Sequence, residues 1–167
     1  GQAKNFEALA TGIGDAKQTL AKLSQFDELT EKMPGGVPAW FQQQAARFGL
    51  GENASAIQVA QAITKSLIPA QRQGMPGAVS DFDAKNFEAT LPQFINTPEG
   101  RRMISDTLKS VAQYQIERGK IAMRAQDGEI TRAQANKLFR ELPDPFAIFK
   151  DYQSQNGKGG KGDAQPQ

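Results

Sequence analysis

Apolar residues recur along the first part of the chain at alternating steps of three and four residues, the spacing that places them on one side of an α-helix. The positions are Phe6, Leu9, Ile13, Ala16, Leu20 and Leu23. This apolar seam covers only about three heptads, and Gly12 and Gly14 weaken its middle by roughly 1 kcal/mol each. We therefore predict that residues 1–33 form an amphipathic helical segment that docks on a partner or on another copy of the chain. The predicted docking residues are Phe6, Leu9, Ile13, Leu20 and Leu23.

Proline and glycine then interrupt the apolar pattern. Two prolines and two glycines within residues 34–38 stop the first segment, and they mark the start of a predicted helical core domain over residues 34–153. A short aromatic helix is expected over residues 39–48. Its Trp40 and Phe41 favour a place in the core, because aromatic side chains bury large areas.

Two further helices are expected before the centre of the chain. The first lies between residues 53 and 69, and its apolar face consists of Ile57, Ala60, Ile63, Leu67 and Ile68. The second follows Ser80, whose hydroxyl can cap a helix, and covers residues 81–90. Leu91-Pro92 is expected to end it, because proline lacks the backbone N–H that a helix interior requires.

The longest predicted helix starts at Thr97, where a capping residue is followed by Pro98 and Glu99. It can continue to about Arg124, since no proline follows Pro98 in this stretch. One side is apolar, with Ile104, Leu108, Val111 and Ala112. The other side carries a basic stripe made of Arg101, Arg102, Lys109, Arg118, Lys120 and Arg124.

A turn and a capping box follow the long helix. Asp127-Gly128 is typical of a turn between helices. Thr131 and Gln134 have the spacing of a capping box, in which each side chain bonds the other residue's backbone N–H. The helix that they start is expected to turn Ala135, Leu138 and Phe139 inward.

The last helix is expected to open at Asp144-Pro145, with Phe146, Phe149 and Tyr152 facing inward. Residues 154–167 are rich in glycine and lysine and have nothing to bury, so a disordered tail is predicted there. No window shows the alternation of a strand, and no apolar run approaches the roughly 20 residues needed to span a bilayer. The predicted fold class is therefore all-α, with about six or seven helices in a small orthogonal or elongated bundle.

One short segment occurs twice. The letters Ala-Lys-Asn-Phe-Glu-Ala stand at residues 3–8 and again at residues 84–89. The flanking residues do not continue the match, so a repeat architecture is not indicated. Coincidence and a short duplicated helix start both stay open.

The composition excludes several kinds of chemistry. The chain has no cysteine and no histidine, which removes thiolate nucleophiles, imidazole bases and the commonest zinc ligands. Residues 127–130 resemble half of a calcium-binding EF-hand loop, but Met123 and Ala125 stand where oxygen ligands would be needed, and Gln134 stands in place of the bidentate acid. We expect no catalytic residues, no metal, no cofactor and no small-molecule substrate.

Paired carboxylates leave one enzymatic alternative. Asp81 with Asp83, or Asp83 with Glu88, would suit the cleavage of a cell-wall glycan, a reaction that uses two carboxyl groups. Helix capping and solvation already explain the same residues. This alternative is the less favoured one.

DNA binding is a second alternative. The formal charge of +2 is too close to balance to indicate it, so any affinity would have to come from a local patch. Arg118, Lys120 and Arg124 on the basic stripe are candidate contacts for DNA phosphates. Asp106 and Glu117 interrupt the stripe, which favours a solvated helix face instead.

Four short segments stand in a distinctive order. They are Gly77-Ala78-Val79-Ser80-Asp81, Leu91-Pro92-Gln93-Phe94, Thr97-Pro98-Glu99-Gly100 and Leu142-Pro143-Asp144-Pro145-Phe146. Over about residues 57 to 149 this order resembles a segment of tailed-bacteriophage virion proteins, the internal or ejection-type proteins that accompany DNA into the host. The chain departs from the family pattern at Phe94, at Arg101 and within residues 144–146. The residues that carry the motif are Ser80, Asp81, Thr97, Pro98, Glu99 and Gly100.

The resemblance implies a non-enzymatic virion component, internal or portal-associated, that acts in assembly and genome delivery. It implies other virion proteins, such as portal or ejection proteins, and further copies of the chain as partners. The expected location is the phage particle, or the host cytoplasm before assembly. Some family members carry a peptidoglycan-cleaving domain, which this chain lacks, so that activity is not carried over.

Overall fold

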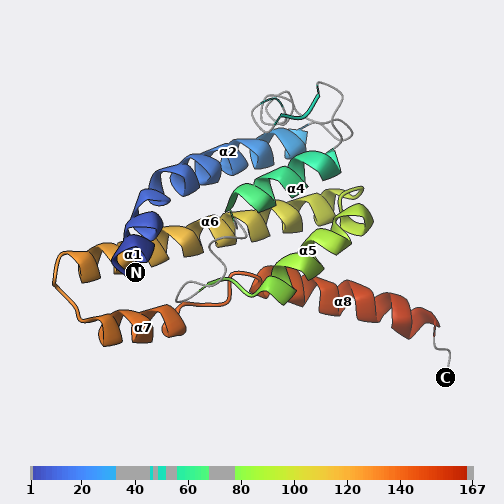
Figure 1. The fold of residues 1–167 in the computed structure, drawn as a ribbon. Coiled ribbons are helices and arrows are strands. Elements are labelled where there is room, and N and C mark those ends of the chain that lie inside the picture. The colour runs from blue at the N-terminus through green and yellow to red at the C-terminus, as the bar shows by residue number, and fades with distance from the viewer. Residues whose placement is uncertain (1, 33–45, 47–48, 52–55, 68–77, 165–167) are drawn as a thin grey trace.

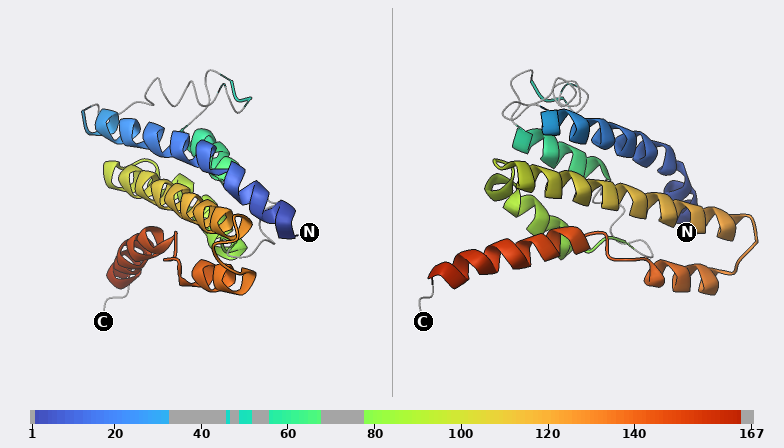
Figure 2. Two further views of the ribbon diagram at one scale, coloured as in Figure 1. Left: turned by 90° about the vertical axis from the view of Figure 1, so that its left-hand side faces the viewer. Right: turned by 180° about the vertical axis from the view of Figure 1, so that it is seen from behind.

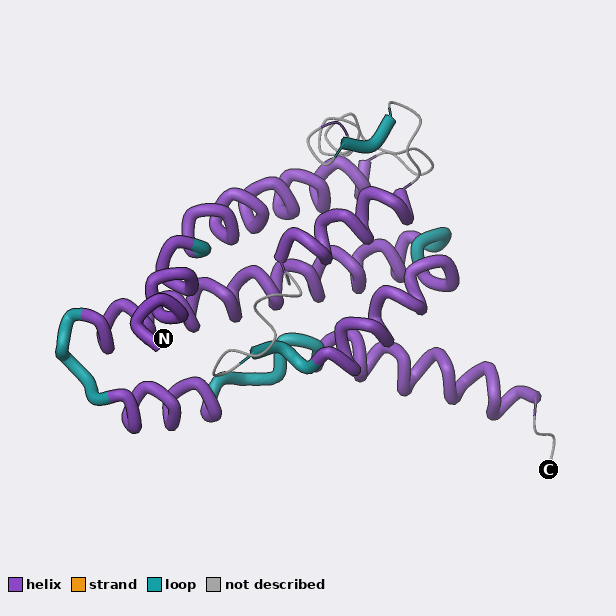
Figure 3. The backbone as a smooth tube through the Cα atoms, in the orientation of Figure 1, coloured by secondary structure: helices purple, strands orange, loops and turns teal. Residues whose placement is uncertain are grey.

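The fold is helical in the part of the chain that the structure describes. The computed structural model describes residues 2–32, 46, 49–51, 56–67 and 78–164, and within these ranges it contains seven helices and no strand (Figures 1 and 3). The helices are α1 (Gln2–Thr11), α2 (Ile13–Lys32), α4 (Ala56–Leu67), α5 (Asp81–Phe94), α6 (Pro98–Gln126), α7 (Arg132–Glu141) and α8 (Ala147–Ala164). The all-α prediction is confirmed. None of these helices has the length and apolar content that a bilayer crossing requires.

Helix α6 is the central element of the fold. It has 29 residues and is about 44 Å long, and the other helices pack around it. Helices α1 and α2 run along one side of α6, whereas α7 and α8 lie on the opposite side (Figure 2). Since several neighbours cover it, α6 buries far more than one stripe of its surface.

The buried apolar residues form two clusters. The larger one joins α2, α4, α5, α6 and α8, and it includes Leu23, Val59, Phe87, Leu108, Val111 and Phe149. The smaller one lies where α1 and α7 meet the end of α6, and it consists of Phe6, Leu9, Ile121, Ala122, Ala135 and Phe139. The first 32 residues therefore contribute to both clusters and pack together with the predicted core domain.

The amino-terminal seam forms two helices where the sequence predicts one. The break falls at Gly12, one of the two glycines expected to weaken it. Backbone bonds still bridge the break, because the Gly12 N–H donates to the Ala8 carbonyl (3.2 Å) and the Ala16 N–H donates to the Gly12 carbonyl (3.1 Å). The chain therefore bends at Gly12 with little loss of hydrogen bonding.

The expectation that Leu91-Pro92 ends a helix is wrong. Helix α5 contains Pro92 and continues to Phe94. Proline removes one N–H and so costs one bond to the preceding turn, but Leu91 and Phe94 are both buried in the core. The Leu91 carbonyl is also satisfied, by the N–H of Ile95 at 2.9 Å. The burial of the last turn of α5 in the core therefore outweighs the helix-ending effect of Pro92.

The predicted elements after α6 are confirmed, with one difference in length. Gly128 has a φ of +78°, the left-handed conformation of a helix-terminating turn, and Thr131 with Gln134 forms both bonds of the capping box. Phe146 and Phe149 are buried. Helix α8 covers Ala147–Ala164, so its last turns fall within the segment that is predicted as a tail.

Some predictions fall on residues that the structure does not describe. These are the 34–38 boundary, the aromatic helix over residues 39–48 with Trp40 and Phe41, and the extreme tail at residues 165–167. Helix α4 confirms the helix expected between residues 53 and 69. The repeated hexapeptide occurs once in α1 and once in α5, and in both copies the phenylalanine, Phe6 or Phe87, is buried.

Candidate functional site

The residues that carry the family resemblance lie at the start of α5 and at the corner between α5 and α6. The Ser80 hydroxyl accepts a hydrogen bond from the Asp83 N–H at 3.2 Å, and the Thr97 hydroxyl accepts one from the Gly100 N–H at 3.0 Å. Pro98 occupies the first turn of α6, where its missing N–H is not needed. These residues therefore act as helix caps, as predicted.

Gly100 permits a close approach at the same corner. A Cβ at this position would stand 2.8 Å from Thr97 Oγ1 and would also clash with the backbone carbonyl of Phe94. The two acidic residues of the motif remain on the surface: Asp81 pairs with Lys85 at 3.1 Å, and Glu99 is exposed in the first turn of α6. The motif thus combines structural positions with two exposed carboxylates.

The predicted docking seam is covered by the chain itself. Phe6, Leu9 and Leu23 are buried, and Ile13 and Leu20 are partly buried against the larger core cluster. The covering element is α6, which packs along both α1 and α2. This seam is therefore not open to a partner surface. Its apolar residues pack against α6 of the same chain instead of forming a coiled coil with another chain.

The three candidate DNA contacts lie in different environments. Arg118 is 1% exposed, so its guanidinium does not reach the surface. Lys120 pairs with Glu117 at 3.4 Å, and Arg124 pairs with Glu129 at 3.4 Å. The predicted basic stripe is thus interrupted at its centre, and the two exposed cations already have acidic neighbours.

Arg118 belongs to a buried polar network instead. Its guanidinium donates a hydrogen bond to Gln115 Oε1 at 3.0 Å, and Gln115 Nε2 donates to the Leu67 carbonyl at 3.1 Å. The guanidinium carbon also lies 5.9 Å from the centroid of the Tyr114 ring. The network ties α6 to the carboxyl end of α4, because Leu67 is the last residue of that helix. The network was not predictable from the sequence, since Arg118 reads as part of the solvent-facing stripe and no pattern singles out Gln115.

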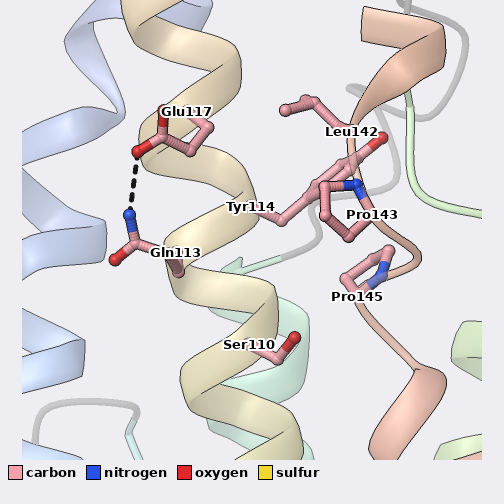
Figure 4. A pocket seen from close by; sticks show the side chains of 7 residues that line it. All are labelled: Ser110, Gln113, Tyr114, Glu117, Leu142, Pro143 and Pro145. Atoms are coloured by element: carbon pink, nitrogen blue, oxygen red, sulfur yellow. Dashed lines mark hydrogen bonds between the residues drawn. The ribbon is translucent and has the colours of Figure 1, made fainter.

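A pocket of about 250 Å³ lies between α6 and the loop that joins α7 to α8 (Figure 4). It is lined by Ser110, Gln113, Tyr114, Glu117, Leu142, Pro143 and Pro145. Figure 4 shows Tyr114 extending from α6 toward Pro143 and Leu142 on the facing loop. The loop side of the pocket consists of residues from the last segment of the family resemblance.

Polar side chains of this pocket are engaged in hydrogen bonds and ion pairs and are not placed for a reaction. Gln113 Nε2 donates to Glu117 Oε1 at 2.9 Å, and Lys120 pairs with the same carboxylate oxygen. Burial raises the pKa of Tyr114, Arg118 opposes that rise and Asp144 adds to it, so the phenol stays protonated at neutral pH. With Leu142 and two prolines forming the opposite wall, the pocket suits an apolar side chain better than a bond-making step.

Two of the three carboxylates considered for glycan cleavage, Asp81 and Asp83, are engaged in ion pairs with lysines. Asp83 lies 2.9 Å from Lys150 Nζ, and Asp144 lies 2.7 Å from the same nitrogen. Lys150 thus joins α5, the loop before α8 and α8 itself, a role that sequence analysis missed because its partners are far apart along the chain. Glu88, half-buried on α5, completes the set of predicted carboxylates.

The lysine and its partner influence each other's protonation. Hydrogen bonds from Lys150 to Asp144 and to Asp83 raise the pKa of Lys150. Partial burial by itself would raise the pKa of Asp144, but the hydrogen bonds from Lys150 and from the Phe146 N–H outweigh it and lower that pKa. Within the described ranges, no three acidic side chains come together in a way that would hold a metal ion.

Phe87 connects the same two regions through apolar contacts. Its ring centroid lies 5.8 Å from that of Phe146 and 5.3 Å from that of Phe149. The start of α5, just after the first resembling segment, and the last resembling segment, about 60 residues further along the chain, are therefore joined by both ionic and aromatic contacts.

Comparison of the chain with protein-family models, with curated proteins and with solved structures finds no match.

Proposed function

We propose that this protein is a non-enzymatic component of a bacteriophage virion, internal or portal-associated, that acts through contacts with other virion proteins in assembly and genome delivery. The observation that carries the proposal is the convergence of the resembling segments. Asp83, two residues after the first segment, and Asp144 from the last segment share Lys150, and Phe87 on the helix that follows the first segment packs on Phe146. Motifs that stand in a fixed order along the chain and lie near one another in the fold are better explained as a structural unit shared with that family than as chance matches.

A binding role is also what the chemistry of the site favours. The pocket beside Tyr114 has an apolar wall, and its one carboxylate, Glu117, is hydrogen-bonded to Gln113. General acid–base catalysis needs a titratable group placed against a reacting atom, and the carboxylates Asp81 and Asp83 are instead paired with lysines. Partners of the proposed type are portal or ejection proteins and further copies of this chain.

The proposal is tested by mass spectrometry of purified virions from a phage that encodes the chain. We expect the protein in the particle at a fixed ratio to the portal protein, and cross-linked to other virion proteins. Infected-cell lysate lacking particles serves as the background control. Absence from washed particles, or production of the chain by an uninfected cell, would overturn the proposal.

A further inference from the structure

A second hollow lies between the first half of α6 and α8, and it is open to solvent. Its volume is about 350 Å³. Its apolar floor is formed by Met103 from α6 and by Ile148 and Tyr152 from α8. We call it the α6–α8 groove.

The exposed position of Ile148 follows from the way α8 is anchored. Phe149 is buried among core aromatic residues, and the Tyr152 ring packs edge-on against Phe94 with 5.0 Å between centroids. Since neighbouring helix residues point about 100° apart, burying Phe149 leaves Ile148 at the side, where it is 42% exposed. A large apolar side chain is thus held at the surface beside Met103 and Tyr152.

The rim of the groove is acidic. It carries the carboxylates of Glu99, Asp106 and Asp151 and the single guanidinium of Arg102, so three negative charges against one positive charge give a formal sum of −2. Asp106 also lies 3.9 Å from Lys109 on the next turn. The groove therefore has a charge opposite in sign to that of the whole chain, which is +2.

Glu99 links the groove to the resembling motif. Thr97 caps α6, Pro98 occupies its first turn and Gly100 allows the close approach to Phe94, so these three residues have structural tasks. Glu99 complements the helix dipole as well, but its carboxylate is exposed on the groove rim.

We infer that the α6–α8 groove binds a basic amphipathic helix of another protein, with an aliphatic side chain on Ile148 and Tyr152 and with Lys or Arg side chains facing Glu99 and Asp151. Such a helix matches both the apolar floor and the acidic rim. Nucleic acid does not, since its phosphates would face the carboxylates. The inference rests on the proposed function and deepens it by naming the surface and the chemistry of the partner.

The test uses the full chain and a synthetic amphipathic peptide of about 14 residues, long enough to form a helix, with leucines at three- and four-residue spacing and lysines elsewhere. A matched peptide with glutamates in place of the lysines is the control. Fluorescence anisotropy gives the affinity, and amide chemical shifts give the location. We expect only the basic peptide to bind, with shifts confined to residues 99–106 and 148–155.

Two variants are compared with a matched surface variant. Ile148→Ser removes the exposed aliphatic group, and Asp151→Lys reverses a rim charge; each is expected to weaken binding by about tenfold or more. Glu141→Lys reverses a charge at the exposed end of α7 and is expected to leave binding unchanged. Circular dichroism verifies that each variant is folded.

The inference is overturned if the basic peptide does not bind, if the acidic peptide binds equally well, or if all variants retain wild-type affinity. Shifts of the groove residues that depend on protein concentration without peptide would identify a second copy as the occupant and would also overturn it. Because the measurement uses purified protein, its result is independent of whether the chain is found in virions. Failure here and failure of the proposed function are therefore distinguishable.

Discussion

Gly119 on α6 lies so close to Ile13 at the start of α2 that a Cβ on Gly119 would stand 2.7 Å from Ile13 Cδ1 and 2.8 Å from the carbonyl oxygen of Leu9. The bend at Gly12 is therefore next to the point where the amino-terminal helices cross α6. A glycine on the central helix allows α1 and α2 to approach it closely.

Replacing Gly119 with alanine should destabilise the protein. Alanine is better than glycine within a helix by about 1 kcal/mol, but the added methyl group has no space, and overpacking of this kind costs roughly 1–3 kcal/mol. We expect a lower free energy of unfolding in urea. In an Ile13→Ala background, Gly119→Ala should cost less than it does in the wild type, since Ile13 supplies part of the clash.

Gly14 provides the matched control for this prediction. It lies within α2 and is exposed, and nothing is within 4 Å of a Cβ placed there. Gly14→Ala should therefore stabilise the protein by up to about 1 kcal/mol. If both alanine variants changed stability in the same direction, close contact at Gly119 would not be the cause.

The stability of the α5–α6 corner should depend more on Gly100 than on the capping residue Thr97. Gly100→Ala places a methyl group against the Phe94 carbonyl, which is backbone and cannot rotate away, so we expect a loss of at least about 1–3 kcal/mol. Thr97→Ala removes one capping bond and should cost about 1 kcal/mol, whereas Thr97→Ser keeps that bond. Urea unfolding of the three variants gives the order, and equal stability of Gly100→Ala and wild type would contradict the tight corner.

Arg118 and Lys120 should respond differently to truncation, although both belong to the predicted basic stripe. Arg118→Ala empties a buried volume and leaves the Gln115 amide oxygen without its donor, so we expect a loss of about 2–4 kcal/mol. Lys120→Ala removes an exposed ion pair and should change stability by less than about 0.5 kcal/mol. Thermal unfolding distinguishes the two.

The two exposed cations of the stripe, Lys120 and Arg124, test the DNA alternative. If exposed cations bound duplex DNA, Lys120→Glu/Arg124→Glu would abolish a salt-sensitive interaction while the protein stayed folded. We expect no such binding in wild-type protein at low salt. Loss of binding in an Arg118 variant alone would report unfolding rather than a DNA contact, because that side chain is buried.

Lys150 should stabilise the fold over a defined range of pH. Its pKa is raised in the folded chain, so its contribution is present below the ordinary lysine value of 10.5 and is lost as the pH rises through the folded value. The pKa of Asp144 is lowered, so its contribution is present above the ordinary value of 3.8 and is lost as the pH falls through the folded value. Wild type should therefore exceed Lys150→Met in stability between these limits.

The expected difference is small, because the Lys150 side chain is 45% exposed and solvent screens the pairs. About 1 kcal/mol is an upper value near pH 7. Urea unfolding of both proteins from pH 3 to pH 11 measures it. Lys137→Met is the control, since Lys137 lies 4.0 Å from Glu141 and both side chains are mostly exposed. A difference that grew below pH 3.8 would contradict the assignment.

Helix boundaries were the most predictable feature, because their signals are local. The hydroxyls of Ser80, Thr97 and Thr131 bond an N–H three residues ahead, so neighbouring letters suffice to identify them. The end of α5 was not predictable in this way. There, the burial of Leu91 and Phe94 by residues far along the chain overrides the proline between them.

The candidate site was much less predictable than the fold. A helical periodicity identifies a solvent-facing side only when a single side is covered, and α6 is covered on several. Arg118 was therefore assigned to the surface although it is buried. The pocket beside Tyr114 and the ion pairs of Lys150 depend on the loop before α8 returning to α6 and α5, which no short pattern records.

Leu23 allows the internal and external roles of the amino-terminal seam to be separated. Because it is fully buried in the larger core cluster, Leu23→Ala should lower the free energy of unfolding by about 2–5 kcal/mol. The oligomeric state of the Leu23→Ala protein under native conditions should equal that of wild type, as measured by size-exclusion chromatography with light scattering. Lys17→Ala, an exposed change on the same helix, should alter neither property. If Leu23→Ala instead kept its stability while the protein changed from oligomer to monomer, the seam would be an interface between chains, and its packing on α6 would not be the arrangement in solution.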